Sequence, residues 1–225
     1  IIKTAWDGLT LGGSFYPPSS GDPSGYTIPP LTPADSGYYF METVSIVRDV
    51  INNLGTYFPN YDGNGYEIAG FGWHQGWNDV IQPNLVPLYE TNLKNFILDM
   101  RDSLGVDSLP FVVGLAGLHG PYENIKGKDY EDRVMEFWNA QFSVSDYIKN
   151  TDFIGNVTTV DTRYFVRLQE NSVSNQEYFW HQNAESFFLI GDAMAKGMQS
   201  LLQSDTTCNK TIQAEDAVFG GGATV

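Results

Sequence analysis

The sequence predicts an α/β fold with three layers, in which a mostly parallel sheet lies between two layers of helices. Strand-like segments alternate with long amphipathic segments along the 225 residues, and this order builds parallel sheets. Residues 109–116 form a continuous apolar run, which is typical of a parallel strand buried on both faces. With 42% hydrophobic residues, the chain can form one globular core, so we expect one main domain.

The first half of the chain contains two strand-like segments and two predicted helices. A short apolar segment at 1–5 favours a strand, and a loop rich in Pro, Gly and Ser follows over 12–35; loops of this length usually carry function. A helix that ends at Gly55 is expected next, because apolar residues recur at helical spacing: Phe40, Val44, Val47, Ile51 and Leu54. A strand over 67–73 leads to a second helix that ends at Gly105, with an inner face formed by Leu85, Leu88, Tyr89, Leu93, Phe96, Met100 and Leu104.

The second half repeats this alternation. The buried strand 109–116 is followed by a helix over 130–148, a β-branched strand over 156–161 and a last helix over 184–202. The apolar face of the last helix is formed by Phe187, Ile190, Met194, Met198 and Leu201. We expect these helices to pack on the sheet.

Charge and composition exclude several classes of partner. The chain has 12 basic and 27 acidic residues and a net charge of -15, which argues against nucleic acid and anionic membranes, because phosphates are bound by Lys and Arg. No run of 18 apolar residues occurs in the sequence, so we expect no membrane insertion. Zinc-binding spacings and EF-hand loops do not occur either, and we expect no metal and no cofactor.

The most informative segment follows the predicted strand over 67–73. The apolar run ends at Trp73 and continues directly into His-Gln-Gly-Trp-Asn-Asp over 74–79. A strand that ends in a glycine turn presents the next side chains at the carboxyl edge of the sheet, where open α/β folds bind ligands. Asn78 is a neutral donor at this edge and suits an oxyanion hole. The alternative is a side chain that caps the turn.

The Gly-x-Asn-Asp tetrapeptide at 76–79 resembles the third block of the hydrolases named for Ser, Gly, Asn and His (SGNH hydrolases). The surrounding Trp-x-Gln-Gly-x-x-Asp frame resembles their carbohydrate esterase branch, the sialate O-acetylesterase-like proteins. Four further segments resemble family segments in the family's order: 1–8, 15–21, 56–63 and 183–193. The resemblance implies an SGNH hydrolase or flavodoxin-like arrangement that removes O-acetyl groups from sugars by serine acyl transfer, with an acetylated carbohydrate as the partner.

The family's nucleophilic serine lies in a Gly-x-Ser-x segment after the first strand. That segment would precede residue 1, so we expect the nucleophile and the first strand to lie upstream of this chain. The serines that are present have no matching context: Ser14, Ser19 and Ser36 are examples.

The remaining catalytic groups are also implied by the resemblance. Ester hydrolysis needs a base, a group that orients it, and donors for the oxyanion. His181 matches the family's base, and Glu177 is the nearest carboxylate that could orient it. Asn78 and the backbone N–H of Gly8 match the oxyanion donors.

Three positions depart from the family pattern. Asp7 replaces a glycine, Phe179 stands where some members carry the histidine, and Tyr178 stands where many carry the orienting aspartate. These departures favour an alternative function, in which the chain is a catalytically inactive glycan-binding or structural extracellular glycoprotein.

Other side chains near the predicted edge have weaker assignments. Gln75, Trp77 and Trp180 are predicted to contact the sugar, and buried packing is the alternative for the two tryptophans. His74 is expected to pack or to form a wall of the site, and His119 is expected to line the cleft because it follows a strand.

The composition changes after Gln203. Residues 204–207 have a linker composition, and residues 211–218 resemble the first strand of a β-sandwich carbohydrate-binding module. We therefore expect an esterase-like domain, truncated at its N-terminus, over 1–203, and a linker with the start of that module over 204–225. The alternative is a terminal strand that pairs with the edge of the sheet.

Two sequons and one cysteine bear on the compartment. Asn156 and Asn209 each begin an N-glycosylation triplet, which predicts a secreted or extracellular protein. Cys208 is the single cysteine, which predicts either a disulfide to a region outside this chain or a free thiol.

Overall fold

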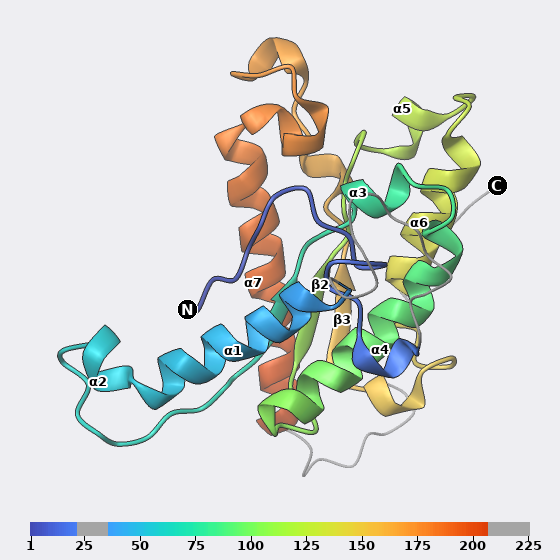
Figure 1. Cartoon of the computed structure of the whole chain (residues 1–225). Helices are drawn as coiled ribbons and strands as arrows, with labels where there is room; N and C mark the ends of the chain where they lie inside the picture. Colours follow the sequence, from blue (N-terminus) through green and yellow to red (C-terminus); the bar gives the residue numbers. More distant parts are fainter. Residues whose placement is uncertain (22–35, 207–225) are drawn as a thin grey trace.

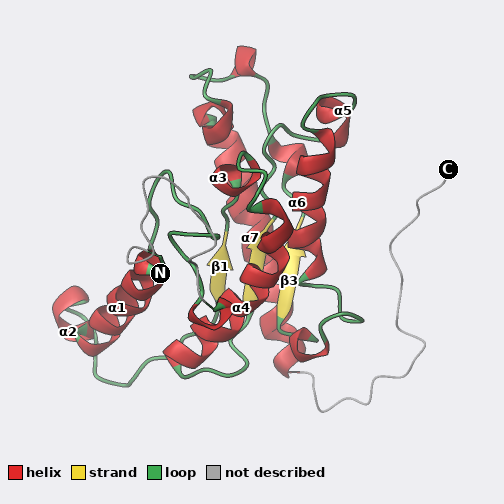
Figure 2. Ribbon diagram, turned by 45° about the vertical axis from the view of Figure 1, so that its right-hand side comes forward, coloured by secondary structure: helices red, strands yellow, loops and turns green. Residues whose placement is uncertain are grey.

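The computed structural model describes residues 1–21 and 36–206. These residues contain a three-stranded parallel sheet with the order β1-β2-β3 (Figures 1 and 2), formed by β1 (Phe71–Trp73), β2 (Phe111–Gly114) and β3 (Val157–Val160). Phe71 lies opposite Phe111, and Phe111 lies opposite Val157. The predicted α/β fold with a parallel sheet is confirmed.

Helices cover both faces of the sheet (Figure 1). Helix α7 (Ala184–Thr206) lies against β2 and β3 on one face. On the other face lie α4 (Val86–Leu104) and α6 (Glu131–Ser143), which pack against each other, and α1 (Tyr38–Asn52), which packs against α4. The shorter helical segments are α2 (Leu54–Tyr57), α3 (Trp77–Val80), α5 (Tyr122–Ile125), η1 (Pro18–Ser20), η4 (Thr151–Phe153), η5 (Arg163–Phe165), η6 (Gln169–Asn171) and η7 (Glu177–Gln182).

The alternation of side chains along β1 shows why two helical layers are needed. The rings of Phe71 and Trp73 lie 6.0 and 4.4 Å from the ring of Phe96 on α4. Gly72, between them, faces α7, because a Cβ on it would lie 3.4 Å from Met194. Successive strand residues point to opposite faces, so each face requires its own cover.

Glycines bring α7 close to the sheet. A Cβ on Gly114 would lie 2.8 Å from the Met194 sulfur, and a Cβ on Gly70 would lie 2.4 Å from the Met198 sulfur. A larger residue at either position would therefore require the methionine side chain to move. Ile190 and Leu201 on the predicted inner face of α7 are buried, whereas Phe187 is 47% exposed because it lies in the first turn of α7, beyond the helix's contact with the sheet.

Several element boundaries differ from the prediction. Residues 1–5 form no strand, and α1 ends at Asn52, with Asn53 as its cap, rather than at Gly55. The Asn53 side chain donates to the carbonyl of Asp49 (2.9 Å), which ends the helix earlier. The chain then forms α2 through Gly55. The predicted end of α4 at Gly105 is confirmed, with Gly105 in the left-handed conformation at φ +70°.

Some predictions fall on residues that the structure does not describe. Cys208, the sequon at Asn209 and the strand predicted over 211–218 lie outside the described residues, as does most of the loop predicted over 12–35. Within the described ranges, no helix combines the length and apolar character needed to cross a bilayer.

Candidate active site

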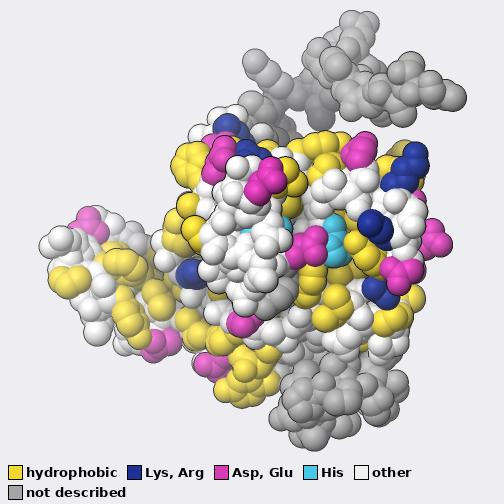
Figure 3. Space-filling model, turned by 90° about the horizontal axis from the view of Figure 1, so that it is seen from above, with side chains coloured by type: hydrophobic (Ala, Val, Ile, Leu, Met, Phe, Trp, Pro, Cys, Tyr) yellow, Lys and Arg dark blue, Asp and Glu magenta, His cyan; other side chains and the backbone are white. Residues whose placement is uncertain are grey.

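Segments that follow two neighbouring strands meet at the carboxyl edge of the sheet. Helix α3 follows β1, the loop 115–120 follows β2, and η7 leads into α7. Figure 3 looks down on this end and shows histidine side chains at the surface beside a carboxylate, among apolar side chains. Edges of this kind are where open α/β sheets bind ligands.

The two predicted oxyanion donors lie side by side. Gly8 has a φ of +76°, which favours glycine. A Cβ on Gly8 would lie 3.8 Å from Nδ2 of Asn78, the second residue of α3. A backbone N–H beside a neutral amide is the kind of donor pair that stabilises an oxyanion.

Asp79 fixes the segment that follows Gly8 against α3. Its carboxylate accepts hydrogen bonds from the backbone N–H groups of Leu11 and Gly12, both at 2.9 Å, and from Nε2 of Gln75 at 2.6 Å. Asp79 is fully buried, and burial raises its pKa to about 6. In the sequence, Asp79 is recognisable only as the last residue of the Gly-x-Asn-Asp motif. The backbone groups that it binds lie about 70 positions away, so no local pattern reveals this structural role.

Gln75, which the sequence predicted to contact the sugar, is held by the fold. Its Nε2 donates to the carbonyl of Leu9 (3.1 Å) and to Asp79, and its Oε1 accepts from the hydroxyl of Tyr89 (3.0 Å). Both N–H groups of the amide are therefore used, and a sugar could accept a hydrogen bond from Nε2 only by displacing one of them. Gln75 therefore positions α3 and the Gly8 segment.

Gly76 permits α3 to start where it does. A Cβ at Gly76 would lie 2.2 Å from Cζ of Phe137, which is buried on α6. Real side chains do not approach so closely, so the turn between β1 and Asn78 requires glycine.

The loop after β2 is fixed from several sides. The backbone of Ala116 donates to Oε1 of Gln141 and accepts from Nε1 of Trp138, both at 2.9 Å. The hydroxyl of Thr162 donates to the carbonyl of Leu115. Leu118 has a φ of +46°, a strained conformation for a residue with a branched side chain. These contacts hold His119 at a defined position.

His119 is paired with Glu177. Its Nδ1 lies 2.7 Å from Oε1 of Glu177, and this hydrogen bond lowers the pKa of the Glu177 carboxyl. The imidazole stacks on Tyr130 at 4.7 Å and lies 5.3 Å from the ring of Trp77. The His119 side chain is 17% exposed, so it is partly open to solvent. His119 is thus packed between the rings of Tyr130 and Trp77.

His181 lies in η7 in a strained backbone. Trp180, His181 and Gln182 have φ values of +48°, +53° and +55°, and left-handed residues cost about 1 to 2 kcal/mol each. The backbone of His181 is anchored by bonds to Gln176 (3.0 Å) and Ser174 (3.1 Å). Its Nδ1 is buried and has no hydrogen-bond partner among the described residues. The charge of His181 also lowers the pKa of the Glu177 carboxyl, but by less than the hydrogen bond to His119 does.

His74 packs against Trp180, with ring centroids 4.9 Å apart. Its Nδ1 lies 3.1 Å from the carbonyl of Gly114 and therefore carries the proton, because a carbonyl only accepts. Burial lowers the pKa of His74 and so favours the neutral ring. This arrangement agrees with the predicted packing role.

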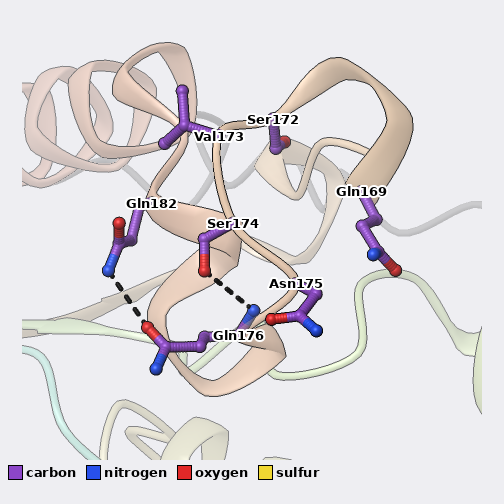
Figure 4. A pocket seen from close by; sticks show the side chains of 7 residues that line it. All are labelled: Gln169, Ser172, Val173, Ser174, Asn175, Gln176 and Gln182. Carbon is purple, nitrogen blue, oxygen red and sulfur yellow. Dashed lines mark hydrogen bonds between the residues drawn. The ribbon is translucent and has the colours of Figure 1, made fainter.

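A shallow hollow of about 650 Å³ lies beside η7 (Figure 4). Apart from Val173, its lining side chains are polar and uncharged: Gln169, Ser172, Ser174, Asn175, Gln176 and Gln182. Gln182 donates to Gln176 across the hollow at 3.0 Å. The same Gln176 accepts a hydrogen bond from the backbone of His181, so the hollow adjoins the predicted base.

A second hollow of about 790 Å³ runs along the outer edge of β1. It is lined mainly by apolar groups from residues 1–6, α1 and residues 66–75. In the described part of the chain, β1 pairs only with β2. The outer edge of β1 therefore keeps backbone groups that another strand could pair with.

Asn156, one of the two sequon residues, is hydrogen-bonded to the buried side chain of Arg101. Its Oδ1 accepts from Nη2 of Arg101 at 2.8 Å, and Arg101 also donates to the carbonyl of Leu109. Asn156 is half-buried, and its Nδ2 lies 3.5 Å from the carbonyl of Asp152.

No group of three or more His, Cys, Asp or Glu side chains suited to a metal ion occurs in residues 1–21 and 36–206.

Comparisons with known proteins found a similar solved structure and a matching family. A search of curated proteins gave no significant match. A crystal structure of an Arabidopsis thaliana protein is similar, with 20% identity, a TM-score of 0.48 and coverage of 72% of this chain. The chain spans about half (52%) of the length of that protein. A family profile described as "Carbohydrate esterase, sialic acid-specific acetylesterase" matches residues 42–200. Because that match covers more than half of the chain, the chain belongs to this family of carbohydrate esterases.

Proposed function

We propose that this chain is the esterase domain of an enzyme that removes O-acetyl groups from sugars by serine acyl transfer. The observation that carries the proposal is the adjacency of Gly8 and Asn78 at the carboxyl edge of the sheet. In an acyl transfer, both donors would bind the oxygen that becomes negatively charged when the acetyl carbonyl is attacked. Asp79 and Gln75 hold the two donors in register.

The proposed nucleophile is a serine from a segment outside the described residues. The apolar hollow beside β1 lies between the edge of that strand and residues 1–6. One additional strand would fit in this hollow. A serine at the carboxyl end of such a strand would reach the edge that carries Asn78, because parallel strands end on the same side. This placement supports the serine mechanism that the family resemblance implies.

The proposed substrate is an acetylated carbohydrate. Sugars are recognised by hydrogen bonds to hydroxyl groups, and the hollow beside η7 supplies six amide or hydroxyl side chains without a charge. We also propose that the protein is secreted and that a carbohydrate-binding module follows the esterase domain.

Acetate release tests the function. The protein at its full natural length is incubated with acetylated monosaccharides and oligosaccharides, and acetate is quantified. Asn78→Ala is expected to lower kcat by about 100- to 1,000-fold, the usual effect of losing one oxyanion donor. Asn139→Ala, which removes an exposed asparagine on α6, is the matched control and should retain full activity. Equal activity in both variants would refute the oxyanion assignment, and an inactive wild-type protein would favour a glycan-binding role.

A further inference from the structure

We propose that the shallow hollow beside η7 is a subsite that binds an uncharged sugar unit of the glycan on which the esterase acts. The inference rests on the proposed function, because it assigns the place where that function holds its carbohydrate. It is carried by the amide and hydroxyl side chains that the segment 169–182 gathers around the hollow and by the strained backbone that brings Gln182 to them (Figure 4).

Several polar groups of the hollow are available to a ligand. Nε2 of Gln182 donates to Oε1 of Gln176 at 3.0 Å, which leaves the side-chain oxygen of Gln182 to accept and Nε2 of Gln176 to donate. The hydroxyl of Ser174 accepts from the backbone N–H of Gln176 at 3.0 Å and can still donate. The side-chain amides of Gln169 and Asn175 make no hydrogen bond to another described residue. The hollow therefore offers donors and acceptors side by side.

This mixture of groups matches the hydroxyl groups of a sugar. Each sugar hydroxyl can donate one hydrogen bond and accept others, so neighbouring amide and hydroxyl side chains can bind adjacent hydroxyls. Val173, which is 83% exposed, adds an apolar contact for the C–H groups of the ring. The volume of about 650 Å³ lies in the range of ligand sites, about 300 to 1,000 Å³. Because the hollow is shallow, a glycan can continue beyond the bound unit.

The absence of charge from the lining of the hollow favours an uncharged sugar over an acidic one. Every described side chain that lines it is an amide, a hydroxyl or Val173. A carboxylate is bound best by Arg, which donates two parallel hydrogen bonds to it. Arg167 lies two positions before Gln169, but it already binds both carboxylate oxygens of Glu185 at 2.8 and 3.0 Å. We therefore expect the subsite to bind uncharged sugar units more tightly than acidic ones.

Hydrogen bonds hold the hollow in shape and join it to η7. The backbone N–H of His181 donates to the carbonyl of Gln176 at 3.0 Å, and the N–H of Ser174 donates to the carbonyl of His181 at 3.1 Å. The side chain of Asn183 donates to the carbonyl of Asn171 at 2.9 Å. Because these groups are fixed before a ligand arrives, less conformational entropy is lost on binding. A sugar in the hollow would also lie beside the segment that the family resemblance assigns to the base.

The strained turn of η7 also points to a binding role. Trp180, His181 and Gln182 are consecutive residues in the left-handed conformation, and such strain is common at ligand sites. Glycine would relieve the strain at residue 182, but it would remove the amide that bonds to Gln176 across the hollow. The Gln182 side chain is exposed, so it does not repay the strain by packing in the core. Its placement is explained by a ligand that the amide binds.

Calorimetric titration of the full-length protein with unacetylated oligosaccharides tests the subsite, because binding requires no catalysis. The uncharged probes are cellohexaose, xylohexaose and mannohexaose, and the charged probe is an oligosaccharide that ends in sialic acid. We expect at least one uncharged probe to bind. Gln176→Ala and Gln182→Ala should each raise its Kd by about 3- to 10-fold, the usual effect of losing one or two hydrogen bonds. Gln199→Ala, which removes an exposed amide on α7, is the matched control and should bind as the wild-type protein does.

Gln182→Gly separates binding from folding. Glycine accepts the left-handed conformation, so this variant should unfold at a urea concentration at least as high as the wild-type protein and yet bind the probe about 3- to 10-fold more weakly. The subsite is refuted if no uncharged probe binds, if the variants of the hollow bind as tightly as the control, or if the charged probe is preferred. Each of these results leaves the esterase function standing. A wild-type protein that binds an uncharged probe through the hollow but releases no acetate would refute the function and retain the sugar site.

Discussion

The clamp at Asp79 predicts an unusual dependence of stability on pH. Three hydrogen bonds to the carboxylate favour its ionised form, whereas complete burial favours the protonated form. Burial is the larger effect and raises the pKa from 3.8 to about 6. The folded protein therefore holds this proton over a pH range in which the unfolded chain has lost it.

The sign and size of the effect follow from this difference. Because the pKa is higher in the folded state, the contribution of Asp79 to stability is complete below pH 3.8 and is lost as the pH rises through about 6. Each pKa unit corresponds to about 1.4 kcal/mol, so the loss amounts to about 3 kcal/mol.

Urea unfolding of the wild-type protein and Asp79→Asn between about pH 3.5 and 7 measures this term. Other carboxylates titrate in both proteins, so their effects cancel in the difference between the two free energies of unfolding. The amide of the variant faces N–H donors and shifts that difference by a constant amount, without changing its slope. We expect the advantage of the wild-type protein to shrink by about 3 kcal/mol as the pH rises. A difference that grows with pH would show that the hydrogen bonds outweigh burial and that Asp79 is ionised in the folded state.

Two further substitutions test the supports of the site. Gly76→Ala should destabilise the protein by about 1 to 3 kcal/mol in urea unfolding, because the added methyl group collides with Phe137. Phe137→Leu in the same chain should recover part of this loss, and additive effects of the two substitutions would contradict the collision. Trp138→Phe should cost about 2 kcal/mol in the same assay, because the carbonyl of Ala116 loses its buried donor. A Trp138→Phe protein as stable as the wild-type protein would show that this hydrogen bond does not hold the loop.

Helices were easier to predict from the sequence than strands. The apolar stripe from Phe40 to Leu54 is a local pattern that specifies a helix, and Gly105 ends α4 as predicted. Strand β1 contains only three residues, fewer than the apolar run around it indicates. The length of a strand depends on how far its partner pairs with it, and a single sequence does not contain that information.

The site was predictable only where the sequence carries a compact motif. Asn78 and Gly8 were found through short segments, and the structure places them side by side. The bond between His119 and Glu177 joins residues 58 positions apart, and no periodicity connects them. The one local signal was a histidine between glycines directly after a buried strand, a position that indicates a cleft residue without revealing its partner.

The central claim is that Gly8 and Asn78 bind the oxyanion of an acetyl ester. A crystal structure of the full-length protein after reaction with a serine-directed phosphonate tests it most directly, because the phosphoryl oxygen occupies the position of the oxyanion. We predict that this oxygen accepts hydrogen bonds from the backbone N–H of Gly8 and from Nδ2 of Asn78, each at about 2.7 to 3.1 Å. A phosphonate bound to a serine at another face of the sheet, or a phosphoryl oxygen that contacts neither donor, would contradict the account.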